Sequence, residues 1–360
     1  MTARAWEWAA RLAGTALLLA AAGASAAEQP MRIVAVPSTA RMVHAVTERL
    51  TKSGVVAPPG VDTSTVPTAV AAFCQSWQKD TPSALALSRR LRIHEAEVCA
   101  LHGVSEIIEI QLGYQALVLV APLSDPEFDV QLRDLRAAVA RDIPGEEGFV
   151  ANTAKSWRDL DPRLPDFPIR VLVPPKEEDS RVFFEERFLE AACRRIPRIR
   201  AISAAPERVE RCTSMREDGV VEDLPEAHGD RLRDALRGAA PGTVAVLPMI
   251  EAKEMMTSAA SMAAAVRMLA IDGVPPSPTS IAARTYPFIQ PIFVYVKKLH
   301  VQDYLGRGAV QGLRELITEL TREQTVGPDG YLVPDGLVPM LEPRRVRVRD
   351  RALTLTVMDR

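Results

Sequence analysis

The chain has 360 residues, of which 47% are hydrophobic and 25% are charged, and its formal net charge is −2. A chain of this length usually forms two domains. The nearly balanced charge excludes a polybasic protein that binds nucleic acid or an anionic membrane surface through its overall charge, so we expect no nucleic-acid partner.

The first 26 residues have the pattern of a cleaved signal peptide. Two arginines flank the n-region, residues 12–23 form an apolar segment that is short for a membrane span, and small residues at 24–26 provide a cleavage site. We therefore expect cleavage before Ala27 and a soluble mature protein in the periplasm. The alternative is an uncleaved membrane anchor.

Beyond this segment, short β-branched runs alternate with helical patterns. Strands that alternate with helices are typical of an α/β fold with mainly parallel sheets flanked by helices. In chain order, the patterns predict strands at 32–36, near 84–87, at 106–113, 114–122, 170–173, 243–249 and 291–298, with helices at 42–50, after 62–65, from about Ile93, at 128–141, from Asp179 and at 312–321.

The chain has four cysteines, Cys74, Cys99, Cys193 and Cys212. Their spacings do not fit CxxC-type zinc or redox motifs. In an oxidising compartment we expect two local disulfides, Cys74–Cys99 and Cys193–Cys212. Each would close a loop of about 20–25 residues and stabilise the fold by roughly 3 kcal/mol. Four free buried thiols are the alternative.

Hydroxyls and arginines gather at four turns that each follow a strand and open a helix, at 37–39, 63–65, 88–90 and 179–181. Ligands of parallel sheets bind at the carboxyl ends of strands, where backbone N–H groups, hydroxyls and a guanidinium can hold a small anion. For any single turn, a serine or threonine that serves as a helix N-cap is the better explanation. All four turns together favour an anion site.

Other chemistry finds little support. The five histidines are scattered, and neither a GxSxG elbow nor a GKS/T phosphate loop is present. We expect no enzymatic activity, no cofactor and no metal site.

The turns and several longer blocks resemble a known family, over about Arg32 to Leu341. The blocks are RIVAVPSTARMVHAVTERL, SRRLRIHEAEVC, EIIEIQLGYQALVLVAP, RCTSMREDG, YPFIQPIFVYVKKLH and VGPDGYLVPDGLVPM. They resemble the phosphate-binding proteins of phosphate ABC importers, in the periplasmic binding protein type II superfamily.

This resemblance implies two lobes, joined by two strand crossovers, that close by a hinge motion on a ligand in the cleft between them. The implied lobes are residues 27–120 plus 292–360 and residues 121–291. The implied function is capture of a phosphate-type oxyanion by a monomer that delivers it to an ABC importer permease. The alternative is a divergent relative that binds another small molecule, or an envelope interaction scaffold that binds no phosphate.

The resemblance also implies a set of ligand-binding residues: Ser38, Thr39, Thr65, Ser88, Arg89, Ser180 and Arg181. The fourth turn departs from the family, because Glu178 and Asp179 take the places of a serine and a glycine. A carboxylate about 4 Å from a bound phosphate would repel it by on the order of 4 kcal/mol at an effective dielectric constant of about 20. Two alternatives are open. Either both acids face solvent and Asp179 caps its own helix, or the turn has changed or lost its ligand.

Overall fold

The structure is a computed structural model that describes residues 31–54, 57–146, 148–176, 178–224, 230–257, 266–302 and 309–359. The predicted signal peptide lies outside these ranges. Among the described residues, no helix is long and apolar enough to cross a membrane.

A sheet of ten strands runs through the whole molecule in the order β2-β1-β3-β11-β4-β9-β7-β8, and β10 and β12 pair with β4. A separate hairpin is formed by β5 and β6. The strands are β1 (Arg32–Ala35), β2 (Gly60–Thr63), β3 (Ala84–Leu87), β4 (Ile107–Pro122), β5 (Asp142–Pro144), β6 (Phe149–Ala151), β7 (Arg170–Val173), β8 (Val221–Asp223), β9 (Thr243–Pro248), β10 (Val266–Leu269), β11 (Ile289–Lys297) and β12 (Val338–Pro339).

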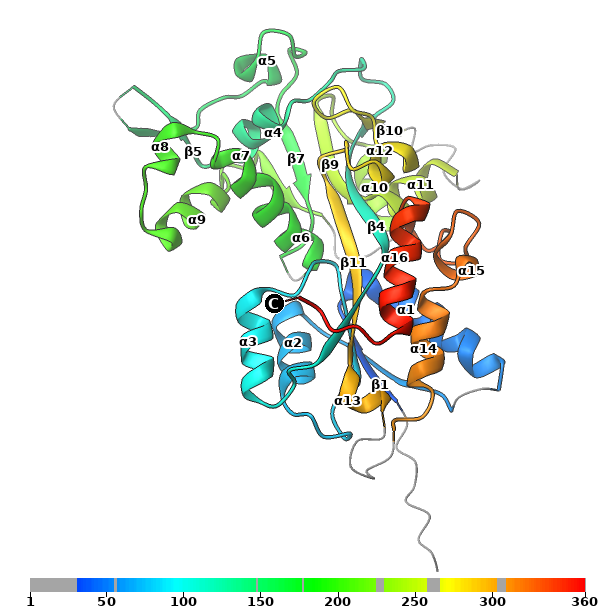
Figure 1. The fold of residues 1–360 in the computed structure, drawn as a ribbon. Helices are drawn as coiled ribbons and strands as arrows, with labels where there is room; N and C mark the ends of the chain where they lie inside the picture. Colours follow the sequence, from blue (N-terminus) through cyan, green and yellow to red (C-terminus); the bar gives the residue numbers. More distant parts are fainter. Residues whose placement is uncertain are drawn as a thin grey trace, which may run out of the picture.

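Strand β4 connects the two halves of the sheet. It pairs with β11 over Ile107–Ala116 and with β9 over Leu117–Val120. The sequence patterns predicted two strands here, but the apolar run is continuous and forms one strand of 16 residues. Figure 1 shows β4 and β11 passing between the two parts of the molecule.

We call the two parts the first and the second lobe. In the first lobe, β1, β2 and β3 are parallel to one another, and in the second lobe β7, β8 and β9 are parallel. The connecting strands β4 and β11 run antiparallel to their neighbours. This architecture confirms the predicted two-lobe α/β fold. The predicted residue ranges of the lobes stay a prediction.

Helices flank the sheet in both lobes (Figure 1). Those of the first lobe are α1 (Pro37–Lys52), α2 (Val66–Cys74), α3 (Ile93–Leu101), α13 (Lys298–Val301), α14 (Leu313–Leu320), α15 (Glu323–Val326) and α16 (Glu342–Leu353). Those of the second lobe are α4 (Leu132–Val139), α5 (Trp157–Leu160), α6 (Asp179–Phe183), the π-helix η1 (Phe184–Glu190), α7 (Ala191–Cys193), α8 (Pro197–Arg200), α9 (Ala205–Thr213), α10 (Asp230–Arg237), α11 (Met249–Thr257) and α12 (Pro278–Ala282).

Each lobe has its own hydrophobic core. In the first lobe, Ile33 and Val294 belong to a cluster on one face of the sheet, and Phe73 and Leu87 belong to a cluster on the other. The second lobe has one large cluster that includes Trp157, whose indole N–H also donates to the carbonyl of Gly242 at 2.7 Å. Burial of these side chains fixes the strand ends that carry the four turns.

One helix begins later than predicted. The pattern predicted a helix over 128–141, whereas α4 starts at Leu132. The residues before it are held in extended structure, because Val130 forms a parallel bridge with Ile271. The carboxylate of Asp272 then accepts a hydrogen bond from the backbone N–H of Leu132 at 3.0 Å, which fixes the start of the helix.

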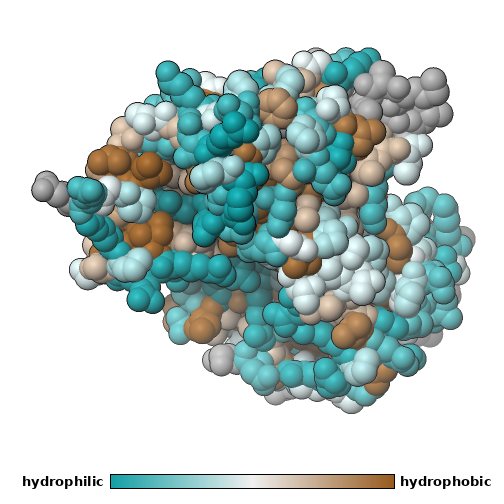
Figure 2. Space-filling model, turned by 90° about the horizontal axis from the view of Figure 1, so that it is seen from above, coloured by the Kyte–Doolittle hydropathy of each residue, from teal (hydrophilic) through white to brown (hydrophobic). Residues whose placement is uncertain are grey.

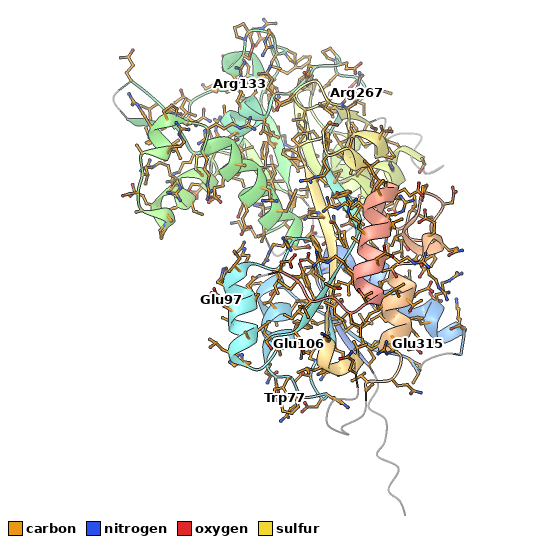
Figure 3. The ribbon with its side chains drawn as sticks, in the orientation of Figure 1. Trp77, Glu97, Glu106, Arg133, Arg267 and Glu315 are labelled. Carbon is orange, nitrogen blue, oxygen red and sulfur yellow. A yellow bond between two sulfur atoms is a disulfide. The ribbon has the colours of Figure 1, made fainter. Side chains whose placement is uncertain are left out.

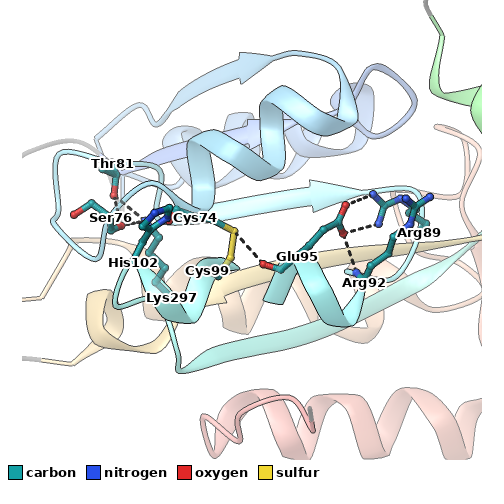
Figure 4. The surroundings of a disulfide bond; sticks show 9 residues. All are labelled: Cys74, Ser76, Thr81, Arg89, Arg92, Glu95, Cys99, His102 and Lys297. Atoms are coloured by element: carbon teal, nitrogen blue, oxygen red, sulfur yellow. Dashed lines mark hydrogen bonds and ion pairs between the residues drawn. A yellow bond between two sulfur atoms is a disulfide. The ribbon is translucent and has the colours of Figure 1, made fainter. Parts of the chain in front are cut away.

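Both predicted disulfides are present, Cys74–Cys99 and Cys193–Cys212. The first joins α2 to α3, as Figure 4 shows. The second joins α7 to the end of α9 and is packed against Ile199 in a small cluster of its own. Both pairs follow from the local spacing of the cysteines.

The outer surface is mostly polar. The face seen in Figure 2 is largely hydrophilic, with small separate hydrophobic patches. Figure 3 places Arg133 and Arg267 on the second lobe and Glu97, Glu106 and Glu315 on the first. Charged side chains on both lobes agree with a protein that is surrounded by water.

The burial of His300 leads us to expect that acid destabilises the first lobe. The ring is completely buried, its Nε2 donates to the Trp77 carbonyl at 2.8 Å, and Nδ1 lies 2.9 Å from the Ser83 hydroxyl. Burial, with a smaller effect of nearby Lys297, lowers the pKa of His300 from 6.5 to about 4. The native state therefore binds fewer protons than the unfolded state between these values, and stability falls as the pH falls through this range.

We expect wild-type protein to lose on the order of 3 kcal/mol of unfolding free energy between pH 7 and pH 4 from this group alone. Urea denaturation at both pH values measures the loss. In His300→Gln, which keeps one donor and one acceptor, the loss should be smaller by about this amount. Equal losses in both proteins would show that His300 does not cause the acid sensitivity.

Candidate ligand-binding site

The turn before α6 meets the turns of the first lobe through Asp179. Its carboxylate accepts a hydrogen bond from the Ser88 hydroxyl at 2.7 Å, another from the Ser38 hydroxyl, and a third from the Ser38 backbone N–H at 3.3 Å. Asp179 is 7% exposed. The side chain therefore reaches from the second lobe into the first and lies between two of the predicted ligand-binding residues.

The start of α1 explains why a carboxylate is held there. The helix begins at Pro37, which has no N–H to donate, and Val36 at the N-cap has no capping side chain. Asp179 supplies the missing acceptor from another part of the chain. A negative charge at the positive end of a helix contributes roughly 0.3–2 kcal/mol.

The sequence left open that Asp179 faces solvent and caps its own helix, and the structure does not agree with that alternative. It does not face solvent, and the N-cap of its own helix is Glu178, which makes no side-chain capping bond. The carboxylate instead lies between Ser38 and Ser88, two of the residues that the resemblance implies as ligand-binding. It satisfies the hydroxyls of Ser38 and Ser88 from within the chain.

Arg89 does not point at this carboxylate. Its guanidinium makes two hydrogen bonds to Glu95 on α3, at 2.6 and 2.9 Å (Figure 4). Burial raises the pKa of Glu95, but hydrogen bonds from Arg89 and from the backbone of Arg92 outweigh it, so the net shift of the pKa is downward. The pair stays ionised at neutral pH, and Arg89 has its countercharge already.

The other polar side chains of the fourth turn also form hydrogen bonds within the chain. The Ser180 hydroxyl donates to the Glu178 carboxylate at 2.8 Å. Arg181 is buried, and its guanidinium donates to Glu185 at 2.7 Å and to Asp223 at 2.7 Å. Arg181 therefore points into the second lobe and away from Ser38 and Ser88.

The two threonines lie apart from the Asp179 contacts. Thr39 is completely buried, and its hydroxyl donates to the Val36 carbonyl at 3.0 Å. Thr65 is the N-cap residue of α2, and its hydroxyl lies 3.0 Å from that of Thr68. The structure thus brings Ser38, Ser88 and Asp179 together, and it gives Thr39, Thr65, Arg89, Ser180 and Arg181 other partners.

Two further ion pairs join the lobes, and the sequence analysis did not find them. Arg92 in the first lobe pairs with Glu186 of η1, and Arg41 of α1 pairs with Glu254 of α11 at 2.9 Å. No motif marks these residues, because each pair is more than 90 positions apart in the chain. Such pairs arise only when the two lobes face each other.

Space remains on both sides of Asp179. A cavity of about 320 Å³ is lined by Ser38, Asp179 and Gln290, and a smaller one of about 170 Å³ by Ser88, Asp179 and Phe183. Among the described residues, no group of three or more histidines, cysteines or acids is placed to hold a metal ion.

The chain matches a known family over most of its length. A family model described as a PBP superfamily domain matches residues 19–324. The chain belongs to the PBP superfamily. No curated protein sequence matches this PBP superfamily chain.

Solved structures of PBP-type proteins have a similar fold. A possible phosphate binding protein from Planctomyces limnophilus is 15% identical with a TM-score of 0.60, and the match covers 91% of this chain and 99% of that one. An ABC-type phosphate transport receptor from Vibrio cholerae is 13% identical with a TM-score of 0.58, covering 86% and 99%. A putative phosphate ABC transporter substrate-binding protein with bound phosphate from Clostridium perfringens is 15% identical with a TM-score of 0.53, covering 87% and 100%. At these identities the likeness extends to the fold alone.

Proposed function

We propose that this chain is a periplasmic solute-binding protein that delivers its ligand to an ABC importer permease, and that the site at its four turns does not capture inorganic phosphate. Membership of the PBP superfamily supports the binding role. The three hydrogen bonds of the Asp179 carboxylate support the second part. A binding protein of this kind needs a cleft and a hinge and no catalytic group.

The argument against phosphate is one of occupancy and charge. Phosphate at this place needs the hydroxyls of Ser38 and Ser88, which already donate to Asp179. If the carboxylate stayed nearby, the repulsion of about 4 kcal/mol would correspond to about three decades of affinity. The two arginines of these turns that the resemblance implies as ligand-binding, Arg89 and Arg181, are paired with carboxylates and offer no compensating charge.

Phosphate remains the second candidate, for one reason. Ser38 and Ser88 present two hydroxyls at the ends of neighbouring elements, and Asp179 shows that an oxyanion fits between them. Opening of the lobes would withdraw Asp179 and expose both hydroxyls. In that case phosphate would compete with the chain's own carboxylate.

Titration of the phosphate-stripped mature protein with phosphate, measured by isothermal calorimetry, tests the proposal. We expect no saturable binding, or binding weaker than about 1 mM, because the site is already filled. Submicromolar binding that is lost in Ser38→Ala and Ser88→Ala would contradict the proposal and support phosphate capture at the four turns.

A further inference from the structure

A third cavity, larger than the two beside Asp179, lies between the lobes next to the connecting strands and has a volume of about 680 Å³. Its walls come from β4, β11, α16, η1 and the loop between α12 and β11. The cavity does not include Ser38, Ser88 or Asp179. Its volume falls within the range of about 300–1,000 Å³ that is typical of sites for organic ligands.

The cavity concentrates positive charge in a protein whose net charge is −2. Six arginines and two glutamates are among its lining residues. Three of these arginines are neutralised by carboxylates, through the pairs Arg89–Glu95, Arg90–Glu109 and Arg194–Glu190. Its other lining glutamate, Glu186, pairs with Arg92, and a cleft with an excess of one sign of charge attracts ions of the opposite sign.

The other three arginines are Arg187 on η1, Arg284 in the loop after α12, and Arg344 on α16. Among the described residues, no carboxylate forms an ion pair with any of them. Arg344 donates to the neutral amide oxygen of Gln111 at 2.6 Å, which leaves its charge uncompensated. Three arginines from three separate segments therefore line one space without an ion-pair partner, and of these Arg187 and Arg284 are exposed whereas Arg344 is partly buried.

A buried hydroxyl supplies an independent sign of a missing partner. Tyr286 lines the same cavity and is 1% exposed, and its hydroxyl has no hydrogen-bond partner among the described residues. Burial raises the pKa of Tyr286, so the group stays protonated and can donate. Buried polar groups normally have partners, and a ligand oxygen that reached this hydroxyl would supply the partner that it lacks.

We propose that this cavity binds a small organic anion with two or more carboxylate or phosphate groups, held by Arg187, Arg284, Arg344 and the Tyr286 hydroxyl. Guanidinium groups bind planar oxyanions through paired hydrogen bonds. Aromatic lining residues such as Tyr114 and Phe293 provide apolar contact for the body of the ligand. This inference rests on the proposed solute-binding function and assigns it a ligand class and a place.

The test uses the mature protein and four probes: citrate, benzene-1,3,5-tricarboxylate, fructose 1,6-bisphosphate and inorganic phosphate. We expect saturable calorimetric binding of at least one organic polyanion and much weaker binding of inorganic phosphate, which carries a single oxyanion group. Comparison of the tricarboxylates with the bisphosphate distinguishes carboxylate from phosphate ester ligands. Failure of all three organic probes to bind overturns the proposal, and so does equal binding of inorganic phosphate.

The variant R187Q/R284Q/R344Q removes the uncompensated charge, and we expect it to weaken binding at least tenfold. The matched control is R200Q/R314Q/R349Q, which changes the net charge equally at exposed arginines outside the cavity. The control should keep the wild-type affinity within about threefold, because its three arginines do not line the cavity and their more distant charges are screened by salt. Equal weakening by both variants would mean that overall charge, and not this cavity, attracts the probe.

Tyr286→Phe separates a binding role from a structural one. Because the hydroxyl has no partner in the protein, its removal should leave the unfolding free energy unchanged or raise it. Binding of the best probe should nevertheless fall by about threefold to tenfold. Unchanged binding would contradict the role given to this hydroxyl.

Failure of this inference and failure of the proposed function are distinguishable. If neither a polyanion nor inorganic phosphate binds, only this inference fails, whereas submicromolar phosphate binding that depends on Ser38 and Ser88 contradicts the proposed function. If a polyanion binds in the cavity but the protein does not stimulate its uptake by a permease, only the delivery role fails.

Discussion

Replacing Asp179 by glycine is expected to raise the affinity for inorganic phosphate about a thousandfold. The substitution removes the carboxylate that accepts hydrogen bonds from Ser38 and Ser88. It also removes a like charge whose repulsion on a bound phosphate is on the order of 4 kcal/mol, which is about three decades in the dissociation constant. Isothermal calorimetry on the phosphate-stripped protein measures the change.

Two variants separate charge from occupancy. Asp179→Asn keeps the shape and one acceptor oxygen but removes the charge, and we expect it to bind phosphate more weakly than the glycine variant. Glu178→Gln changes the neighbouring acid, which contacts Ser180 and neither Ser38 nor Ser88, and should behave as wild type. If Asp179→Gly folds normally by circular dichroism and gains no phosphate affinity, the four-turn site has lost phosphate binding for reasons other than this carboxylate.

Gly242→Ala is expected to destabilise the protein by about 4 kcal/mol. Gly242 has φ +85°, where a side chain costs about 1–2 kcal/mol. A Cβ atom would also overlap the carbonyl oxygen of Pro168 and lie 2.7 Å from the Cβ of Phe167. Relief of this overlap would disturb the bonds of Gly242 to Trp157 and to Asp125, at 2.7 and 2.8 Å.

Gly219 provides a matched control for the backbone conformation. It also has φ +85°, but a Cβ atom there would meet nothing within 4 Å. Gly219→Ala should therefore cost only about 1–2 kcal/mol. Chemical denaturation of both variants yields the difference, which isolates the effect of crowding at Gly242. Equal costs would mean that the second lobe relaxes around the added methyl group.

Local patterns in the sequence were sufficient for most of the fold. The β-branched run at 170–173, the helical spacing after Asp179 and the buried run at 243–249 all appear where predicted, because burial of one face decides such elements. The helix at 128–141 was placed too early, because a bridge from Val130 to the distant Ile271 competes with helical structure. The spacing of neighbouring cysteines sufficed for both disulfides.

The candidate site was only partly accessible from the sequence. Ser38, Ser88 and Asp179 were all singled out as belonging to turns that converge, and the structure brings them together. Arg89 and Arg181 fitted the same pattern, but the guanidinium of Arg89 donates to Glu95 and that of Arg181 donates to Asp223. A turn pattern records which groups are present and does not record which partner each one prefers.

The sequence by itself determined most of the elements, their α/β order, the positions of the two disulfides and the family of this protein, because these depend on local periodicity, short spacings and motif blocks. Only the tertiary structure decided that the Asp179 carboxylate accepts hydrogen bonds from Ser38 and Ser88. It also decided that Arg187, Arg284 and Arg344 line one cavity. The physical reason is that electrostatic and hydrogen-bonding partners are chosen by distance in space. Two lobes that meet across a cleft bring together residues such as Ser38 and Asp179, which are 141 positions apart in the chain.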